Sequence, residues 1–342
     1  MSSVQVRAFA ESGGVEPDSV ADETLPRLDA DMAHVLAVLK SMGWKRLEHC
    51  TAQEARALPT LEMAMRRILR EPAEDLRVTL EYRLIPGPEG EMRVRLYRPA
   101  GEATGPRPLI LYLHDGLFVF GEAEGQDATP RALALRTGAI VLAAHYRQAP
   151  EHRFPAAHED AEAAWTWLLQ HAEDLGGTPG RAAIVGEGSG ANLAVNIAIA
   201  AKAAGETLPR HLGLITPMAA MLHELPSHIA HARAEPVGTE ALKWAVRKLV
   251  RQRDDMHEAR LNIAGRSDLA GLPPATVIIA GIDPLRSEGE ALADALRRAG
   301  VWVDATVYEG VTHGFAGLHQ IVNKAMFAQA QLAQNLTMAL DA

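Results

Sequence analysis

The chain has 342 residues, of which 48% are hydrophobic and 23% are charged, a balance typical of a soluble globular protein with a substantial core. Its formal net charge of −9 argues against a general nucleic-acid binder, which would carry a basic patch. The single cysteine, Cys50, excludes an intramolecular disulfide and leaves a metal–thiolate cluster without ligands. No signal-like segment opens the chain, and the most apolar long stretch, residues 191–204, is too short to span a bilayer. We therefore expect a cytoplasmic protein without a membrane partner.

The first quarter of the chain predicts helices and no strand. Residues 1–26 are polar, and we expect them to be poorly ordered. Apolar residues at helical spacing predict a helix over residues 28–42 that ends at Gly43. A capping-box pattern from Thr51 to Glu54 predicts a second helix that runs toward Ile68. Residues 27–75 are therefore predicted to form a helical arm or cap.

From residue 76 onward, strand patterns alternate with helix patterns. Residues 77–85 and 91–97 read as a hairpin. Further strands are predicted over residues 109–113, 139–143, 182–185, 212–215, 275–280 and 301–308. The helices between and after them cover residues 131–136, 158–171, 190–204, 286–299 and a last stretch to 340. This order predicts an α/β fold with a doubly wound, mostly parallel sheet over residues 76–342, interrupted by a cap insertion around 220–260.

The most informative stretch is residues 182–194, where a short apolar run meets a glycine cluster and then a helix rich in small residues. This is the outline of the strand–turn–helix nucleophile elbow, G-x-S-x-G, in which a serine sits on a strained turn above the sheet. Gly186 and Gly190 are in place, but the residue midway between them is Gly188. A serine, Ser189, follows one position later.

Other motifs stand at the ends of predicted strands. Residues 114–121 read His-Asp-Gly-Leu-Phe-Val-Phe-Gly, at the point where some lipases and esterases carry an HGGG loop whose N–H groups stabilise an oxyanion. Asp283 and His313 follow later in the chain. The order elbow, aspartate, histidine is that of an α/β-hydrolase triad.

Taken together, these motifs resemble those of the bacterial hormone-sensitive-lipase-like carboxylesterases of the α/β-hydrolase superfamily. The resemblance extends from about residue 28 to the C-terminus and includes counterparts of HGGGF, YR-x-APE, FPAA, DPLRDEGE and HGF in order. It implies an α/β-hydrolase fold with a helical cap, and often a homodimer. It places the acid at Asp283, the base at His313 and the nucleophile at the position of Gly188. It also assigns the oxyanion N–H groups to Ser189 and to the loop around Gly116 and Leu117.

The departures from the family pattern lie at the catalytic centre. The nucleophile position holds Gly188, Asp115 and Leu117 replace two loop glycines, and His145 stands where relatives have an aspartate. Loss of the triad serine costs on the order of a millionfold in the turnover number of a serine protease. Hydrolysis through an acyl-enzyme at position 188 is therefore excluded.

Three explanations of the elbow stay open. A serine mutated to trap substrate would not require the changes at Asp115 and Leu117. Ser189 could act as a shifted nucleophile, but one helical position turns its side chain by about 100° and requires His313 to move. The third explanation is natural divergence, either toward base chemistry without a serine or toward an inert or ligand-binding protein.

The retained pair of His313 and Asp283 favours chemistry, although a histidine before Gly-Phe could be a packed loop residue. An imidazole oriented by a carboxylate is suited to proton transfer near neutral pH. For Asp115 we expect a side chain that faces solvent or an arginine, because a carboxylate in an oxyanion loop opposes developing negative charge. If it instead faces the pocket, it could act as an acid or bind a cationic ligand. Phe118 and Glu187 complete the predicted substrate-binding set, with structural support the usual role of Glu187.

Two classes of function follow. The first is a diverged enzyme that acts on a small, fairly apolar ester, lactone or related carbonyl compound through His313 and Asp283. The alternative is a catalytically inactive pseudoenzyme that binds a small ligand in the former acyl pocket. No cofactor is expected. The histidines lack the spacing of a metal site, and the glycine cluster lacks the Gly-Lys-Ser/Thr ending of a phosphate-binding P-loop. Ala191 stands where a dinucleotide-binding G-x-G-x-x-G motif would have its third glycine, so the match to that motif is weak.

Overall fold

The computed structural model describes residues 27–70, 77–101, 103, 105–121, 125–221 and 225–342. The segment that we predicted to be poorly ordered, residues 1–26, lies outside the described residues. The description below concerns the remainder.

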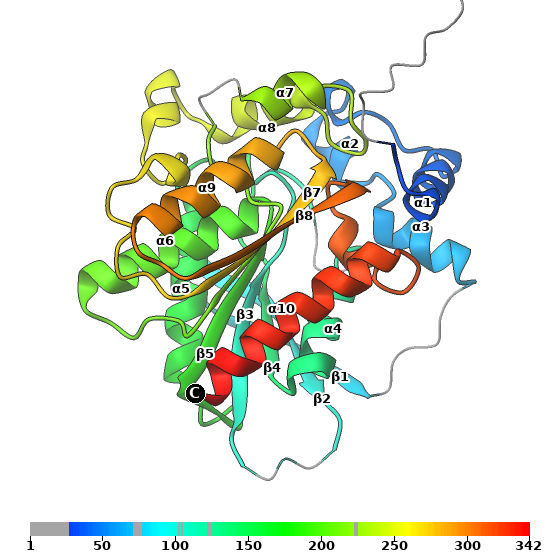
Figure 1. The fold of residues 1–342 in the computed structure, drawn as a ribbon. Coiled ribbons are helices and arrows are strands. Elements are labelled where there is room, and N and C mark those ends of the chain that lie inside the picture. The colour runs from blue at the N-terminus through cyan, green and yellow to red at the C-terminus, as the bar shows by residue number, and fades with distance from the viewer. Residues whose placement is uncertain (1–26, 71–76, 102, 104, 122–124, 222–224) are drawn as a thin grey trace, which may run out of the picture.

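A single eight-stranded sheet in the order β1-β2-β4-β3-β5-β6-β7-β8 forms the centre of the molecule (Figure 1). β1 pairs antiparallel with β2, and β2 with β4, whereas every other neighbouring pair is parallel. The strands are β1 Val78–Gly87, β2 Gly90–Pro99, β3 Arg107–Leu113, β4 Ile140–Ala144, β5 Gly177–Glu187, β6 Leu212–Ile215, β7 Ala275–Ile282 and β8 Val303–Thr312. The predicted doubly wound, mostly parallel sheet is confirmed.

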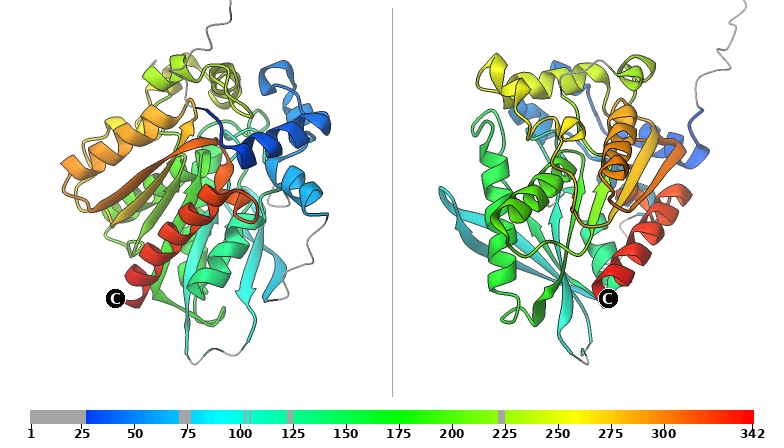
Figure 2. Two further views of the ribbon diagram at one scale, coloured as in Figure 1. Left: turned by 45° about the vertical axis from the view of Figure 1, so that its right-hand side comes forward. Right: turned by 60° about the vertical axis from the view of Figure 1, so that its left-hand side comes forward.

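Helices cover both faces of this sheet (Figure 2). Alternate residues of β3 point to opposite sides: Leu109 and Leu111 belong to one apolar core, and Ile110 and Tyr112 belong to the other. The first core is closed by α5 Ala156–Gln170, α6 Ser189–Ala204 and α9 Arg286–Arg298, and the second by α4 Ala128–Thr137 and α10 Asn323–Asp341. Burial of the strands on both faces explains their nearly continuous apolar runs in the sequence.

The N-terminal arm differs from the prediction at one point. The first helix, α1 Ala30–Ser41, lies where it was predicted, and the capping box of Thr51 and Glu54 is present. The predicted continuous second helix is wrong, however, because it is split into α2 Ala52–Arg56 and α3 Leu61–Ile68. Pro59 explains the break, since a proline lacks an N–H donor and disfavours helical backbone at the residue before it.

The arm and the segment around residues 226–257 meet above the carboxyl ends of the strands. This segment contains α7 Pro226–Ala230 and α8 Thr239–Leu249. The indole N–H of Trp244 on α8 donates to the carbonyl of Cys50 at 2.8 Å, and Lys40 pairs with Glu235 at 2.6 Å. Arg56 ties the arm to the core, donating to the carbonyls of Val119 and Ala149. The two segments together cover the edge of the sheet at which α/β proteins bind ligands.

Glu288, on α9, anchors the start of the cap segment. Its side chain is buried and accepts hydrogen bonds from the N–H groups of Ala219 and Ala220, and it pairs with His228 at 2.9 Å. We predict that Glu288→Ala lowers the free energy of unfolding by about 3–5 kcal/mol, because it leaves buried donors without an acceptor. Urea unfolding measures this loss. As a control, Glu290→Ala removes a partly exposed ion pair and should change stability by less than about 1 kcal/mol. Equal unfolding midpoints for the two variants would contradict the anchoring role.

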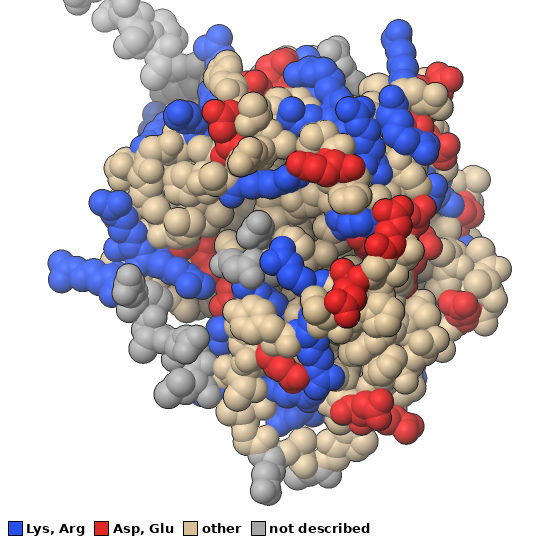
Figure 3. Space-filling model, turned by 180° about the vertical axis from the view of Figure 1, so that it is seen from behind, with Lys and Arg blue, Asp and Glu red and all other residues tan. Residues whose placement is uncertain are grey.

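Charged side chains of both signs are interspersed over the face seen in Figure 3. Among the described residues, none of the helices is long and apolar enough to cross a membrane.

Candidate active site

The nucleophile elbow is retained as architecture. β5 ends at Glu187, Gly188 has a φ of +51°, and α6 begins at Ser189. The turn is so tight that a Cβ on Gly186 would overlap the backbone of Gly190. The glycines that bracket the motif are therefore required by the close approach of strand and helix.

The space above Gly188 is filled by Asp115. A Cβ added to Gly188 would overlap the carboxylate of Asp115, so this side chain occupies the position into which a serine would project. Its Oδ1 accepts from the N–H of Ser189 at 3.1 Å and from the N–H of Leu117 at 3.4 Å. The expectation that Asp115 faces solvent or an arginine is wrong. The N-terminus of α6 and the loop N–H groups give the carboxylate partners that solvent would otherwise supply.

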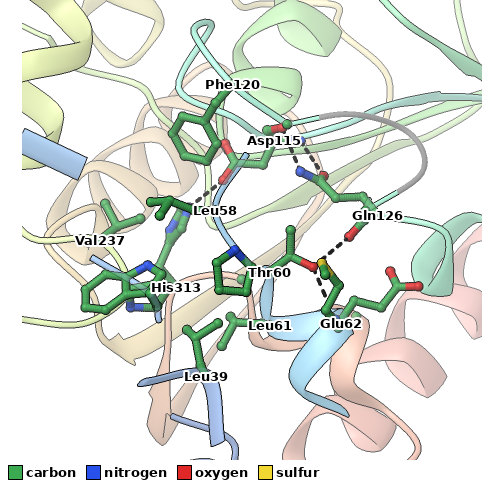
Figure 4. Close-up of a pocket in the computed structure, with 18 of the residues that line it drawn as sticks. Leu39, Leu58, Thr60, Leu61, Glu62, Asp115, Phe120, Gln126, Val237 and His313 are labelled. Carbon is green, nitrogen blue, oxygen red and sulfur yellow. Dashed lines mark hydrogen bonds and ion pairs between the residues drawn. The ribbon is translucent and has the colours of Figure 1, made fainter. Parts of the chain in front are cut away.

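Asp115 also contacts the histidine of the predicted acid–base pair (Figure 4). His313 Nε2 lies 2.7 Å from Asp115 Oδ2, and His313 Nδ1 lies 2.8 Å from Asp283 Oδ2. All three side chains lie at the carboxyl ends of strands: Asp115 after β3, Asp283 after β7 and His313 after β8. Parallel strands bring these ends to one edge, which is why residues 198 positions apart in the chain form a hydrogen bond.

The charges of this group follow from its contacts. Burial would lower the pKa of His313, but the carboxylates of Asp283 and Asp115 outweigh it and raise the pKa well above 6.5. Burial would raise the pKa of Asp115, yet His313 and the N–H groups of Gly116 and Ser189 bring it down to about 2. At neutral pH the site therefore contains an imidazolium between two carboxylates.

Ser189 does not take the place of the missing nucleophile in this geometry. Its side chain is fully buried, and its hydroxyl lies 3.1 Å from the hydroxyl of Tyr146, which in turn donates to the carbonyl of His114. The second contact of the Ser189 hydroxyl is Asp115 Oδ1 at 3.5 Å. In the described part of the chain, His313 has Asp115 and Asp283 as its hydrogen-bond partners and not Ser189.

A cavity of about 350 Å³ opens above the Asp115–His313 pair. Arm residues form much of its wall, and its apolar lining includes Leu39, Leu58, Leu61, Phe120 and Val237 (Figure 4). Gly188 and Ser189 do not belong to the lining, so the cavity ends at the Asp115 carboxylate and the His313 ring.

Of the two remaining residues predicted to bind substrate, one lines the cavity. Phe118 is fully buried and stacks on His158, so the prediction that it binds substrate is not supported by its position, and Phe120 takes this place. Glu187 lines the cavity and accepts from the hydroxyl of Tyr112 at 3.0 Å. Burial raises the pKa of Glu187 to about 7, so a substantial part of its population is the neutral acid near neutral pH.

Two residues that the sequence reasoning did not assign support the site. Gln126 donates to the carbonyl of Asp115 at 2.9 Å and accepts from its N–H at 3.0 Å, which fixes the backbone of the loop. Tyr146 hydrogen-bonds the Ser189 hydroxyl at 3.1 Å. Tyr146 belongs to the YR-x-APE motif, which could have singled it out, whereas Gln126 has no signal in the sequence.

The described residues contain no group of three or more His, Cys, Asp or Glu side chains arranged to hold a metal ion. His158 is packed between Phe118 and Phe154 and hydrogen-bonds Asn192 at 3.1 Å. Burial lowers the pKa of His158 to about 3, as expected for a neutral core histidine.

Comparisons with known proteins agree with this architecture. A family model described as alpha/beta hydrolase fold matches residues 110–317. The chain is 37% identical over 256 residues to the carboxylic ester hydrolase LipN of Mycobacterium tuberculosis, a match covering 73% of this chain and 68% of LipN. It is 35% identical to the ethyl acetate hydrolase of Pseudomonas putida, covering 68% of this chain and 74% of that enzyme. Among solved structures, the hyperthermophilic esterase of the archaeon Pyrobaculum calidifontis aligns with a TM-score of 0.83 at 32% identity, over 92% of this chain and 99% of that chain. These matches show that the chain belongs to the hormone-sensitive-lipase-like carboxylesterase family of the α/β-hydrolase superfamily.

Proposed function

We propose that this protein is a diverged, serine-independent hydrolase that acts on a small, largely apolar ester, lactone or related carbonyl compound. The observation that carries the proposal is His313, which is oriented by Asp283 and faces a preformed apolar cavity although position 188 offers no nucleophile. In this scheme His313 takes a proton from water, and the resulting hydroxide attacks the substrate. The relatives are named as ester hydrolases, which supports the class of substrate.

General-base action requires the neutral form of His313. The raised pKa of His313 means that the imidazolium predominates at neutral pH while Asp115 is ionised. The neutral fraction grows as the pH rises, so ester hydrolysis by this route should increase toward alkaline pH.

A second candidate is a pseudoenzyme that binds a small ligand in the same cavity. The observation in its favour is that Asp115 accepts hydrogen bonds from the N–H groups that would stabilise an ester's oxyanion. A panel of short p-nitrophenyl esters and lactones, assayed at neutral and alkaline pH, separates the two candidates. Absence of turnover throughout this panel would favour the pseudoenzyme.

The role of Ser189 provides a direct test of serine independence. We predict that Ser189→Ala keeps turnover within about fivefold, because alanine preserves the backbone N–H and the lost hydroxyl contacts Tyr146, not His313. Steady-state kinetics with the best ester of the panel measures the effect. Tyr146→Phe, which removes the partner of the same hydroxyl, is the matched control. A loss of three orders of magnitude in Ser189→Ala alone would identify Ser189 as a shifted nucleophile and overturn the proposal.

A further inference from the structure

Asp115 makes contacts that suit a nucleophile. The general-base scheme for His313 does not use these contacts. Its carboxylate fills the space of the missing serine side chain, borders the cavity and is 13% exposed. One oxygen, Oδ1, is held by two backbone N–H groups, and the other, Oδ2, lies beside His313. Carboxylates serve as covalent nucleophiles in several enzyme classes.

These contacts also define what kind of substrate carbon the carboxylate can attack. If the Asp115 carboxylate itself attacked an ester carbonyl, the negative charge on the ester oxygen would develop without these two N–H groups, because Asp115 Oδ1 occupies them. A saturated carbon in a strained ring does not need them. It needs an acid that protonates the departing oxygen, and the imidazolium of His313 lies within hydrogen-bond distance of the attacking carboxylate.

We propose that the same site has a further activity, the hydrolysis of small apolar epoxides through a covalent ester on Asp115. The proposal rests on the proposed role of His313 as the base that activates water, which it uses in the second step. The apolar wall of the cavity, with Leu58, Leu61 and Phe120, suits a hydrocarbon substituent on the epoxide.

In the first step, Asp115 Oδ2 forms a bond to one epoxide carbon as the C–O bond of the ring at that carbon breaks. The proton on His313 Nε2 passes to the departing ring oxygen. This gives a hydroxyalkyl ester of Asp115 and a neutral imidazole. Asp283 and Asp115 together raise the pKa of His313, and the ester removes the charge of Asp115, so the pKa falls and the imidazole acts more readily as a base.

In the second step, neutral His313 removes a proton from water, and the hydroxide adds to Cγ of Asp115. The negative charge that develops on Oδ1 is stabilised by the N–H groups of Ser189 and Leu117, which already contact this atom. The bond from Cγ to the alkyl oxygen then breaks, and the departing alkoxide takes the proton from His313. The products are a vicinal diol and the carboxylic acid of Asp115, with one oxygen derived from water. This acid returns its proton to His313 Nε2, which restores the Asp115 carboxylate and the imidazolium.

The test is a single turnover of styrene oxide with enzyme in excess in ¹⁸O-labelled water. We expect an unlabelled diol and one ¹⁸O atom in the peptide that contains Asp115, measured by mass spectrometry. Label in the diol together with an unlabelled Asp115 would show that water attacks the epoxide directly, and would overturn the covalent role. Turnover of esters but not of styrene oxide would remove the further activity and leave the proposed function intact. Turnover of neither substrate would refute the proposed function as well.

Two variants test the covalent role of Asp115 by a second measurement that does not depend on the ¹⁸O label. His313→Gln should accumulate an ester with benzyl bromide, whose leaving group needs no acid, as a mass increase on the peptide that contains Asp115. Asp115→Asn should abolish this adduct and reduce styrene oxide turnover at least about a thousandfold. Asp255→Asn is the matched control, because it makes the same change at a buried carboxyl that pairs with Arg251 outside this cavity, and it should leave the adduct in place. An equal adduct in the presence and absence of Asp115 would overturn the proposal.

Discussion

Replacing Gly188 with serine and Asp115 with glycine in the same chain should create a serine esterase, whereas Gly188→Ser alone should not. In the single variant the new Cβ overlaps the Asp115 carboxylate, so the serine hydroxyl cannot reach His313 without displacing it. In the double variant the carboxylate is gone, and the serine lies beside a histidine that Asp283 still orients. The N–H groups of Leu117 and Ser189 are then free to stabilise an oxyanion.

The expected gain is large. A triad serine contributes about a millionfold to the turnover number of a protease, so even an imperfectly placed serine should raise p-nitrophenyl butyrate hydrolysis by at least about a thousandfold over the single variant. The φ of +51° at Gly188 strains a serine by about 1–3 kcal/mol, a cost that the surrounding packing can sustain. Asp115→Gly alone is the control for the vacated loop. Equal activity of Gly188→Ser with and without Asp115 would show that the carboxylate does not block this position.

The second large effect concerns His313. We expect His313→Ala to reduce ester turnover by about a hundredfold to ten-thousandfold, the usual contribution of a positioned proton-transfer group. The accompanying pH profile identifies the role. Since Asp283 and Asp115 raise the pKa of His313, the neutral base becomes more abundant as the pH rises, so the parent's turnover should climb on the alkaline side.

Asp115→Asn provides the control for that profile. Loss of one of the two carboxylates lowers the pKa of His313, so the rising limb of ester turnover should move to lower pH. His211→Asn, a change at a buried histidine that contacts Thr276 within the sheet, serves as the control for general destabilisation. A parent profile that is flat through this range, or unchanged turnover in His313→Ala, would contradict base chemistry at this residue.

Gly188 and the Asp115 carboxylate are sterically complementary. A carboxylate that enters the nucleophile position requires a residue without a Cβ at position 188, and a glycine there leaves room for it. In this position Asp115 contacts two backbone N–H groups and His313. The position above Gly188 is thus filled by a hydrogen-bonded carboxylate.

Much of this protein could be determined from the sequence because the signals are local. Apolar runs separated by glycine-rich turns predicted the mostly parallel sheet, and the order of elbow, Asp283 and His313 predicted the acid–base pair. The predictions that were wrong also have physical explanations. Pro59 divides the predicted second helix into α2 and α3. Phe118 was assigned to the cavity in place of Phe120, because the spacing of residues in a loop does not show which side chains point into the cavity.

The orientation of Asp115 was decided by tertiary structure alone. Asp115 and Ser189 are 74 residues apart, and nothing in either segment indicates that the carboxylate of one meets the N–H of the other. An isolated carboxylate favours water, but in the folded chain two backbone N–H groups and an imidazolium together outweigh the loss of hydration. The sequence alone determined that the serine is absent, and the three-dimensional arrangement of strand ends determined what occupies its place.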